Sequence, residues 1–208
     1  MVLLAVLCIE AGLDRLVVWA PHDNRVHGFY GKIPVDTLQA IHLFREQYKE
    51  KAGQQNVIGV APDAGAASFM IPFCRKMNLN CAVTAKYRPE PEKTAITDIM
   101  GDFNGMDEAI ILDDMINTGG TVEAVIKKLS AEKGINTIWL GVSHFLGSSQ
   151  AVERLIELHE DFGLEEVLVT DSVPAKKEFQ ELDFVKIISL KEPLADAIHC
   201  IHHNLPLT

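Results

Sequence analysis

Hydrophobic residues in this chain gather in short runs that are separated by longer stretches of mixed character. Seven runs have the length and the β-branched content of strands, at residues 15–20, 56–62, 80–85, 108–114, 136–142, 165–171 and 184–190. They are continuous rather than alternating, which is typical of parallel strands that are buried on both faces.

Helical spacing of apolar residues appears between several of these runs. In residues 121–133, one apolar stripe at i, i+3, i+4 and i+7 is formed by Val122, Val125, Ile126 and Leu129. Residues 150–161 and 191–203 show similar spacing. Strands that alternate with helices imply a parallel sheet with helices on both faces. The pattern therefore predicts an α/β fold of the Rossmann-like kind, a parallel sheet flanked by helices.

Two stretches depart from this alternation. Residues 1–15 are apolar at first, but they lack the basic start of a signal peptide and the run breaks at Glu10, so we expect a buried helix. Residues 86–107 contain Pro89 and Pro91, several charges and little periodicity, so we expect a long exposed loop. Loops of this length in compact domains are often functional.

Composition narrows the class of protein. The chain has 208 residues, which suits one large domain or one domain plus a fragment. The formal net charge of −10 argues against a general nucleic-acid-binding protein, although a small anionic ligand can still find a local positive site. No apolar run reaches the roughly 18 residues of a membrane span. We therefore expect neither nucleic acid nor a membrane among its partners.

Cysteine usage points to a reducing compartment. The chain has four cysteines, which lie in apolar contexts and form no C-x-x-C pair. Buried, reduced thiols are typical of proteins inside the cell, so we expect a cytoplasmic location.

The most informative segment is the turn after the run at 108–114, where residues 109–125 read AIILDDMINTGGTVEAV. An apolar strand ends in the adjacent acids Asp113 and Asp114, and a Gly-rich loop then leads into a helix. In α/β sheets, ligands bind beyond the carboxyl ends of the strands, which is where this turn lies. The turn is therefore the first candidate for a binding site.

The loop itself has the properties of a phosphate site. It consists of Asn117, Thr118, Gly119, Gly120 and Thr121. The glycines let backbone N–H groups approach an anion closely, and the helix N-terminus adds a positive partial charge. The two threonines add hydroxyl donors.

Asp113 and Asp114 would repel a phosphate, so they must face another group. Vicinal sugar hydroxyls or a divalent cation suit two carboxylates. The acids and the loop together predict a sugar-phosphate site. A plain strand-to-helix turn with threonine caps and solvated acids is the simpler interpretation, but the ordered string of strand, acid pair, Gly-rich loop and helix favours a ligand.

The segment ILDDMINTGGT resembles a known motif. It is similar to the phosphoribosyl-diphosphate (PRPP) loop of type I phosphoribosyltransferases and of ribose-phosphate pyrophosphokinases, the PRPP synthetases. APDAGAASF at 61–69 resembles the SPDAGG loop of the synthetases, and KYRPEPEKTAITDIMGDFNG at 86–105 resembles their catalytic loop. The segments that match their remaining motifs in order are 12–38, 143–155, 169–174 and 194–204. The resemblance therefore covers nearly the whole chain and favours the synthetases.

This resemblance implies a phosphoribosyltransferase-like fold and an enzyme, a ribose-phosphate diphosphokinase. Such an enzyme transfers the diphosphoryl group of ATP to ribose 5-phosphate, with Mg²⁺ as cofactor, and gives PRPP and AMP for nucleotide biosynthesis. Lys86 and Arg88 match the catalytic cations that stabilise the transferring group.

The resemblance also implies binding roles. Asp113 and Asp114 match the acids on the ribose hydroxyls, and residues 117–121 match the loop on the 5-phosphate. His22 and Asp63 match the histidine and aspartate that contact the metal and ATP.

Several positions depart from the synthetase pattern. Ala20 stands where the family has an aspartate, and Asn117 stands where the phosphate loop usually has another. In the segment that resembles the SPDAGG loop, Ala66 replaces a glycine, and Ser68 and Phe69 replace basic residues. These changes bear on activity more than on fold.

Chain length is the larger departure. A synthetase subunit has two similar α/β domains, and the resemblance makes residues 1–38 a remnant of the first and residues 39–208 the second, which carries the PRPP loop. Nothing in the chain resembles the ATP-binding loop of the first domain. We therefore expect the C-terminal part of a longer protein or a truncated relative, incomplete as an enzyme. Since the synthetases assemble from dimers into rings, we also expect a homo-oligomer.

Two other functions stay open from the sequence. A phosphoribosyltransferase that consumes PRPP would use the same loop, but it would also need a base-binding hood, which no segment resembles. A non-catalytic regulatory subunit fits the lost acids at Ala20 and Asn117, whereas Lys86 and Arg88 argue against it.

Overall fold

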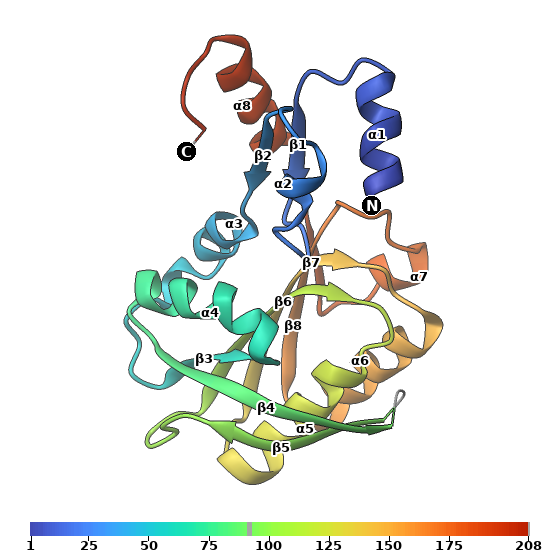
Figure 1. Cartoon of the computed structure of the whole chain (residues 1–208). Helices are drawn as coiled ribbons and strands as arrows, with labels where there is room; N and C mark the ends of the chain where they lie inside the picture. The colour runs from blue at the N-terminus through green and yellow to red at the C-terminus, as the bar shows by residue number, and fades with distance from the viewer. Residues whose placement is uncertain (91–92, 208) are drawn as a thin grey trace.

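The computed structural model describes residues 1–90 and 93–207, with the side chains of residues 1–85 and 98–207. Its main feature is a seven-stranded sheet of order β5-β4-β3-β6-β7-β8-β9 (Figure 1). The strands are β3 (Val57–Ala61), β4 (Asn80–Glu90), β5 (Lys93–Met100), β6 (Glu108–Ile116), β7 (Thr137–Phe145), β8 (Leu164–Thr170) and β9 (Val185–Ile188). Neighbouring strands are parallel except β4 and β5. The predicted α/β fold with a mainly parallel sheet is confirmed.

The prediction of an exposed loop over residues 86–107 is wrong. β4 continues to Glu90, and β5 returns antiparallel to it, with Val83 opposite Met100. The segment of β5 is rich in Thr and Ile, and β-branched residues favour an extended chain. Ile99 is almost fully buried and anchors β5 to the core. The charged residues of this segment obscured its strand character in the sequence pattern.

Helices cover both faces of the large sheet. α3 (Ala40–Gln47) and α4 (Ala64–Met77) pack on one face, and α5 (Gly120–Lys133) and α6 (Ser149–Asp161) pack on the other (Figure 1). The short helices η1 (Lys49–Lys51) and α7 (Lys177–Gln180) lie in connections.

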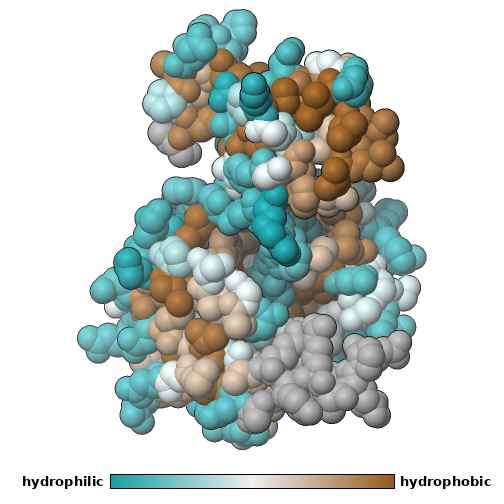
Figure 2. Space-filling view, viewed as in Figure 1, coloured by the Kyte–Doolittle hydropathy of each residue, from teal (hydrophilic) through white to brown (hydrophobic). Residues whose placement is uncertain are grey.

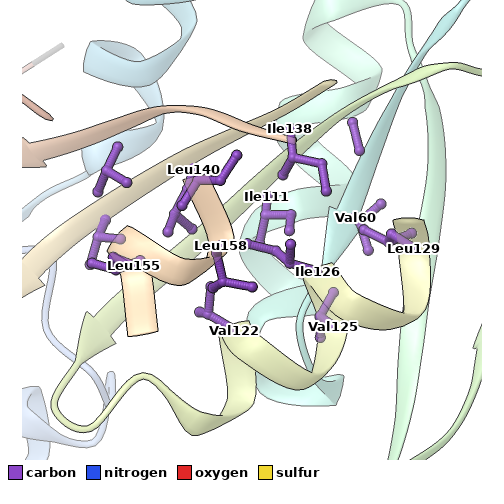
Figure 3. Packing of buried hydrophobic residues seen from close by; sticks show 14 of the residues in the cluster. Val60, Ile111, Val122, Val125, Ile126, Leu129, Ile138, Leu140, Leu155 and Leu158 are labelled. Atoms are coloured by element: carbon purple, nitrogen blue, oxygen red, sulfur yellow. The ribbon is translucent and has the colours of Figure 1, made fainter. Parts of the chain in front are cut away.

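Alternate residues of the central strands enter these two layers. In β6, Ile111 packs with α5 and α6, whereas Ile110 and Leu112 pack with α3 and α4. The apolar stripe predicted on α5 is buried, and Figure 3 shows it close to Ile111 and Leu140. The two close-packed hydrophobic layers hold the central strands rigidly, so the carboxyl ends of β3 and β6 provide fixed positions for side chains.

The first part of the chain forms a separate two-stranded parallel sheet. β1 (Leu16–Trp19) pairs with β2 (Val35–Leu38), and α2 (Val26–Phe29) lies between them in sequence. α8 (Lys191–His202) returns from the far edge of the large sheet to lie beside β1 and β2 (Figure 1), and residues of all three line one cavity. The strand predicted at 15–20 is confirmed, but it belongs to this small sheet, and β2 had no strand prediction.

α1 (Val2–Glu10) is the helix expected at the start of the chain, but its expected burial is wrong. Ala5 is buried, whereas Val2, Leu3, Leu4 and Leu7 are each more than half exposed. Figure 2 shows this hydrophobic surface at the upper right of the molecule. Apolar residues occur on every side of α1, and the small cluster around Ala5 buries only one of these sides. Over the described residues, no helix combines the length and the apolar character needed to cross a membrane.

Candidate active site

A cavity of about 560 Å³ opens at the carboxyl ends of β3 and β6, where the sequence pattern places a ligand. Its lining includes His22, Asp63, Asp113 and Asp114, together with apolar side chains such as Phe69. His22 and Asp114 are 92 positions apart in the chain and contact each other here. The fold therefore brings four of the predicted site residues to one opening.

Asp63 is positioned by the start of α4. It follows β3 in an extended conformation, and its Oδ1 accepts a hydrogen bond from the Ala66 amide at 3.0 Å. Aspartate is one of the preferred residues for capping a helix N-terminus in this way. Since β3 and β6 are neighbouring parallel strands, Asp63 and Asp113 reach the same edge of the sheet.

The acid pair belongs to β6, which continues past it to Ile116. The Oδ1 atom of Asp113 accepts a hydrogen bond from the Asp114 amide at 2.9 Å. Burial, with the neighbouring charge of Asp114, raises the pKa of Asp113 to about 8. At neutral pH, Asp113 therefore carries a proton and can donate it to a ligand oxygen.

His22 pairs with Asp114 at the mouth of the cavity. The Nδ1 atom of His22 is hydrogen-bonded to Oδ2 of Asp114, and this contact raises the pKa of His22. The His22 side chain remains 74% exposed, so water screens the pair. An imidazole and three carboxyl groups thus surround one opening.

The Gly-rich loop begins three residues after Asp114 and is not among the described residues that line the cavity. Gly119 is the N-cap of α5 with a φ of +78°, a conformation that side chains disfavour. It has no side chain with which to cap the helix, so the start of α5 offers backbone N–H groups to an anion. The acid pair predicted to bind the diol and the loop predicted to bind the phosphate therefore follow each other in the chain at the end of β6.

Arg154 of α6 contacts this loop and was not singled out from the sequence. Its Nη1 donates a hydrogen bond to the Thr118 carbonyl at 2.6 Å, and its Nε forms an ion pair with Glu123 of α5 at 2.7 Å. An amphipathic helix pattern gives no sign of such a contact, because Arg154 reads as an ordinary solvated position.

His144 of β7 was also missed. Its Nε2 lies 3.0 Å from the Ala20 carbonyl, and its Nδ1 lies 2.8 Å from the Ser172 hydroxyl. Ala20 has a φ of +38°, which is rare for a residue with a side chain, and it precedes His22 by two positions. His144 therefore ties the turn that carries His22 to the large sheet.

Lys86 and Arg88, the predicted catalytic cations, have side chains that lie outside the described residues. Their backbone belongs to β4, which pairs with β3 as far as Val83 and then runs beyond the carboxyl end of β3. The catalytic role of these two residues stays a prediction from the resemblance.

A family model described as a phosphoribosyl synthetase-associated domain matches residues 49–208. The chain belongs to this family. The matched residues include the large sheet, the acid pair and Gly-rich loop, and α8.

Curated members of the synthetase family are similar over most of the chain. A ribose-phosphate pyrophosphokinase of Aquifex aeolicus is 35% identical over 189 residues, which are 90% of this chain and 58% of that protein. One of Fusobacterium nucleatum is 32% identical over 203 residues, which are 97% of this chain and 62% of that protein. The chain thus spans about three fifths of the length of these relatives.

A solved structure of the family has the same fold. The phosphoribosylpyrophosphate synthetase of Mycobacterium smegmatis matches with a TM-score of 0.82 and 27% identity, over 98% of this chain and 63% of that chain. The family and the fold inferred from the sequence motifs are both confirmed.

The donor chemistry of the cavity fits Mg²⁺, the cofactor that the resemblance implies. Mg²⁺ takes oxygen ligands, keeps several waters, and is usually held by one or two carboxylates together with substrate phosphates. Across the described residues, no group of three or more His, Cys, Asp or Glu is already arranged as a metal cage. Asp63 and Asp114 nevertheless supply carboxylate oxygens to one cavity, which suits a cation shared with a substrate.

Proposed function

We propose that this chain carries the ribose 5-phosphate half of a ribose-phosphate pyrophosphokinase, which transfers diphosphate from ATP to ribose 5-phosphate and yields PRPP and AMP. The observation that supports it most strongly is the order of groups at the end of β6: two carboxyl groups in a cavity, followed by a Gly-rich helix start. A sugar phosphate has hydroxyls for the carboxyl groups and a phosphate for the helix start.

The acid pair is proposed to bind the ribose diol. A protonated Asp113 can donate a hydrogen bond to one hydroxyl oxygen, and Asp114 can accept one from the other hydroxyl. The 5-phosphate would then lie against the residues from Asn117 to Thr121. Holding the sugar at both ends fixes the anomeric hydroxyl, and such positioning is worth a large share of the barrier in a two-substrate transfer.

The metal site is proposed to involve His22 and Asp63. Bound Mg²⁺ would neutralise charge on the transferring diphosphoryl group. Asp63 is held in place by its capping bond to α4. His22 contacts Asp114 through Nδ1, so its Nε2 could bind the cation while Asp114 orients the ring.

The roles of Lys86 and Arg88 are proposed from the resemblance alone. They would stabilise the negative charge of the transferring group, which is the main task in phosphoryl transfer. β4 extends beyond the carboxyl end of β3, the end at which Asp63 lies, and this course supports the proposal.

The domain organisation, the cellular location and the oligomeric state are also proposed. Residues 39–208 form the phosphoribosyltransferase-like domain and residues 1–38 belong to a second domain, which the separate β1–β2 sheet supports. We propose a cytoplasmic homo-oligomer. The four cysteines are free, which agrees with a reducing compartment, although Cys74 is buried and the other three are only partly so.

Thermal unfolding tests the proposed site. Ribose 5-phosphate with Mg²⁺ should raise the Tm of the chain, because a ligand that binds only the folded state stabilises it by about 2.7 kcal/mol at 100 times its Kd. Glycerol phosphate, which has the phosphate without the ribose ring, should raise the Tm much less. Equal shifts for the two ligands would refute recognition of the ribose by Asp113 and Asp114.

A further inference from the structure

Arg154 makes two contacts that join the Gly-rich loop to both neighbouring helices. From α6, its Nη1 reaches the Thr118 carbonyl at 2.6 Å, while its Nε is paired with Glu123 in the first turn of α5 at 2.7 Å. The side chain is 25% exposed, so it lies along the protein rather than in solvent. Only a guanidinium has donors placed to serve both acceptors at fixed angles.

The contact with Thr118 determines the direction of the next amide. In a trans peptide the C=O and the following N–H point in opposite directions, because the peptide unit is planar. Arg154 holds the Thr118 oxygen on the α6 side of the loop, so the Gly119 N–H points away from α6. A carbonyl oxygen turned the other way would place negative charge at the anion position and remove one donor.

The two glycines bring the loop within contact distance of α6. A Cβ at Gly120 would lie 3.5 Å from Arg154 Nη1, and a Cβ at Gly119 would lie 3.6 Å from the Ala151 backbone. The loop therefore lies directly against α6, and the Arg154 side chain packs between them. Glu123 also forms an ion pair with Lys127 at 2.9 Å.

We propose that Arg154 is a positioning residue for the sugar phosphate: it fixes the Thr118–Gly119 peptide so that the Gly-rich loop presents its N–H groups to the 5-phosphate. This inference rests on the proposed function of the loop. Because the charge of Arg154 is paired with Glu123, its role is to orient the backbone, and it need not touch the phosphate itself.

Three variants test the inference. Arg154→Met removes both contacts, and Arg154→Lys keeps the charge but lacks the second donor arm. Lys127→Met is the matched control, because Lys127 also pairs with Glu123 but reaches on to Glu157 of α6 rather than to the loop. Binding of ribose 5-phosphate with Mg²⁺ would be followed by calorimetry, and the Gly119 amide by ¹⁵N–¹H NMR with and without ligand.

We expect Arg154→Met to raise the Kd for ribose 5-phosphate about tenfold or more, as for loss of a charge-assisted hydrogen bond. Arg154→Lys should raise it several-fold, and Lys127→Met should stay within about twofold. In the ligand-free protein, the Gly119 amide should shift and exchange faster in Arg154→Met, with little change in the control.

A merely structural role would lower the Tm of Arg154→Met without changing its Kd, and that result would overturn the inference. So would an Arg154→Lys variant that binds as well as the unaltered chain, since charge alone would then suffice. If the unaltered chain binds no ribose 5-phosphate, the proposed function fails. The ligand-free Gly119 amide would still show whether Arg154 fixes the loop, and an unchanged amide would overturn that claim too.

Discussion

Asp113 shows how the protein environment changes the chemistry of a single residue. Its ordinary pKa is 3.8, and burial beside Asp114 raises the pKa to about 8. Between these values the folded state keeps a proton that the unfolded chain releases, so this carboxyl makes the protein less stable as the pH rises. His22 acts in the same direction, because its raised pKa gives stability at low pH that is lost when the imidazole deprotonates.

Asp113→Asn tests this electrostatic cost. The amide has nearly the shape of the protonated carboxyl but does not titrate, so the variant should gain stability relative to the unaltered chain as the pH rises from 5 to 8.5. The gain should be at least about 1 kcal/mol. Urea unfolding at the two pH values measures the difference. A variant that is equally destabilised at both would mean that the Asp113 carboxyl is not held in its protonated form.

The sequence identified the site residues that belong to recognisable motifs and missed those that act only through packing between distant elements. Asp113, Asp114 and the Gly-rich loop form one contiguous string, so their chemistry could be inferred before any fold was known. Arg154 meets its acceptor across 36 positions and His144 meets Ala20 across 124. Helical or strand periodicity says nothing about such contacts, because they depend on how distant elements pack.

Between elements, His144 joins the turn after β1 to the large sheet. Its Nε2 contacts the Ala20 carbonyl and its Nδ1 contacts the Ser172 hydroxyl. The turn leads directly to His22, and Ala20 keeps an unfavourable φ of +38°, so an outside contact must hold it. Loss of this contact should loosen the turn before it affects the core.

A pair of variants separates the two contacts of His144. Glutamine can place a nitrogen near the Nε2 position and asparagine near the Nδ1 position. We therefore expect amide exchange in residues 20–25 to quicken about tenfold in His144→Asn and to stay near its normal rate in His144→Gln. Exchange followed by mass spectrometry gives the comparison. Exchange at the normal rate in both variants would show that His144 does not hold the turn.

Sequence pattern predicted most elements of the large sheet, and its errors have physical causes. The strands of the central sheet were found because they are buried on both faces and read as apolar runs. β5 was missed because it is an edge strand with charged residues, and edge strands carry less of the core signal. The burial of α1 was overestimated because apolar composition alone does not show whether a neighbour covers it.

For the whole molecule, the exposed face of α1 is the clearest surface feature. Leu3 and Leu7 are 72% and 58% exposed and lie on the same side of the helix, one turn apart. Exposed apolar surfaces of this kind usually mark contacts with other proteins. The proposed homo-oligomer would cover this face with a second copy of the chain.

Light scattering tests this surface. The unaltered chain should have a mass above that of the monomer, and the double variant Leu3→Glu, Leu7→Glu should lower it. Ile198→Glu is a suitable control, because Ile198 is 66% exposed but lies on α8. A monomeric mass for every form, or the same oligomer in all of them, would exclude α1 as the contact.

The central claim is that the end of β6 recognises a ribose diol beside a phosphate, and one calorimetric comparison tests it most directly. Ribose 5-phosphate and 2-deoxyribose 5-phosphate share the phosphate and the ring and differ in one hydroxyl of the diol. With Mg²⁺ present, the chain should bind ribose 5-phosphate about tenfold more tightly or better, because the deoxy sugar leaves one carboxyl of the acid pair without its partner. Equal affinities would contradict the assignment of Asp113 and Asp114 to the sugar.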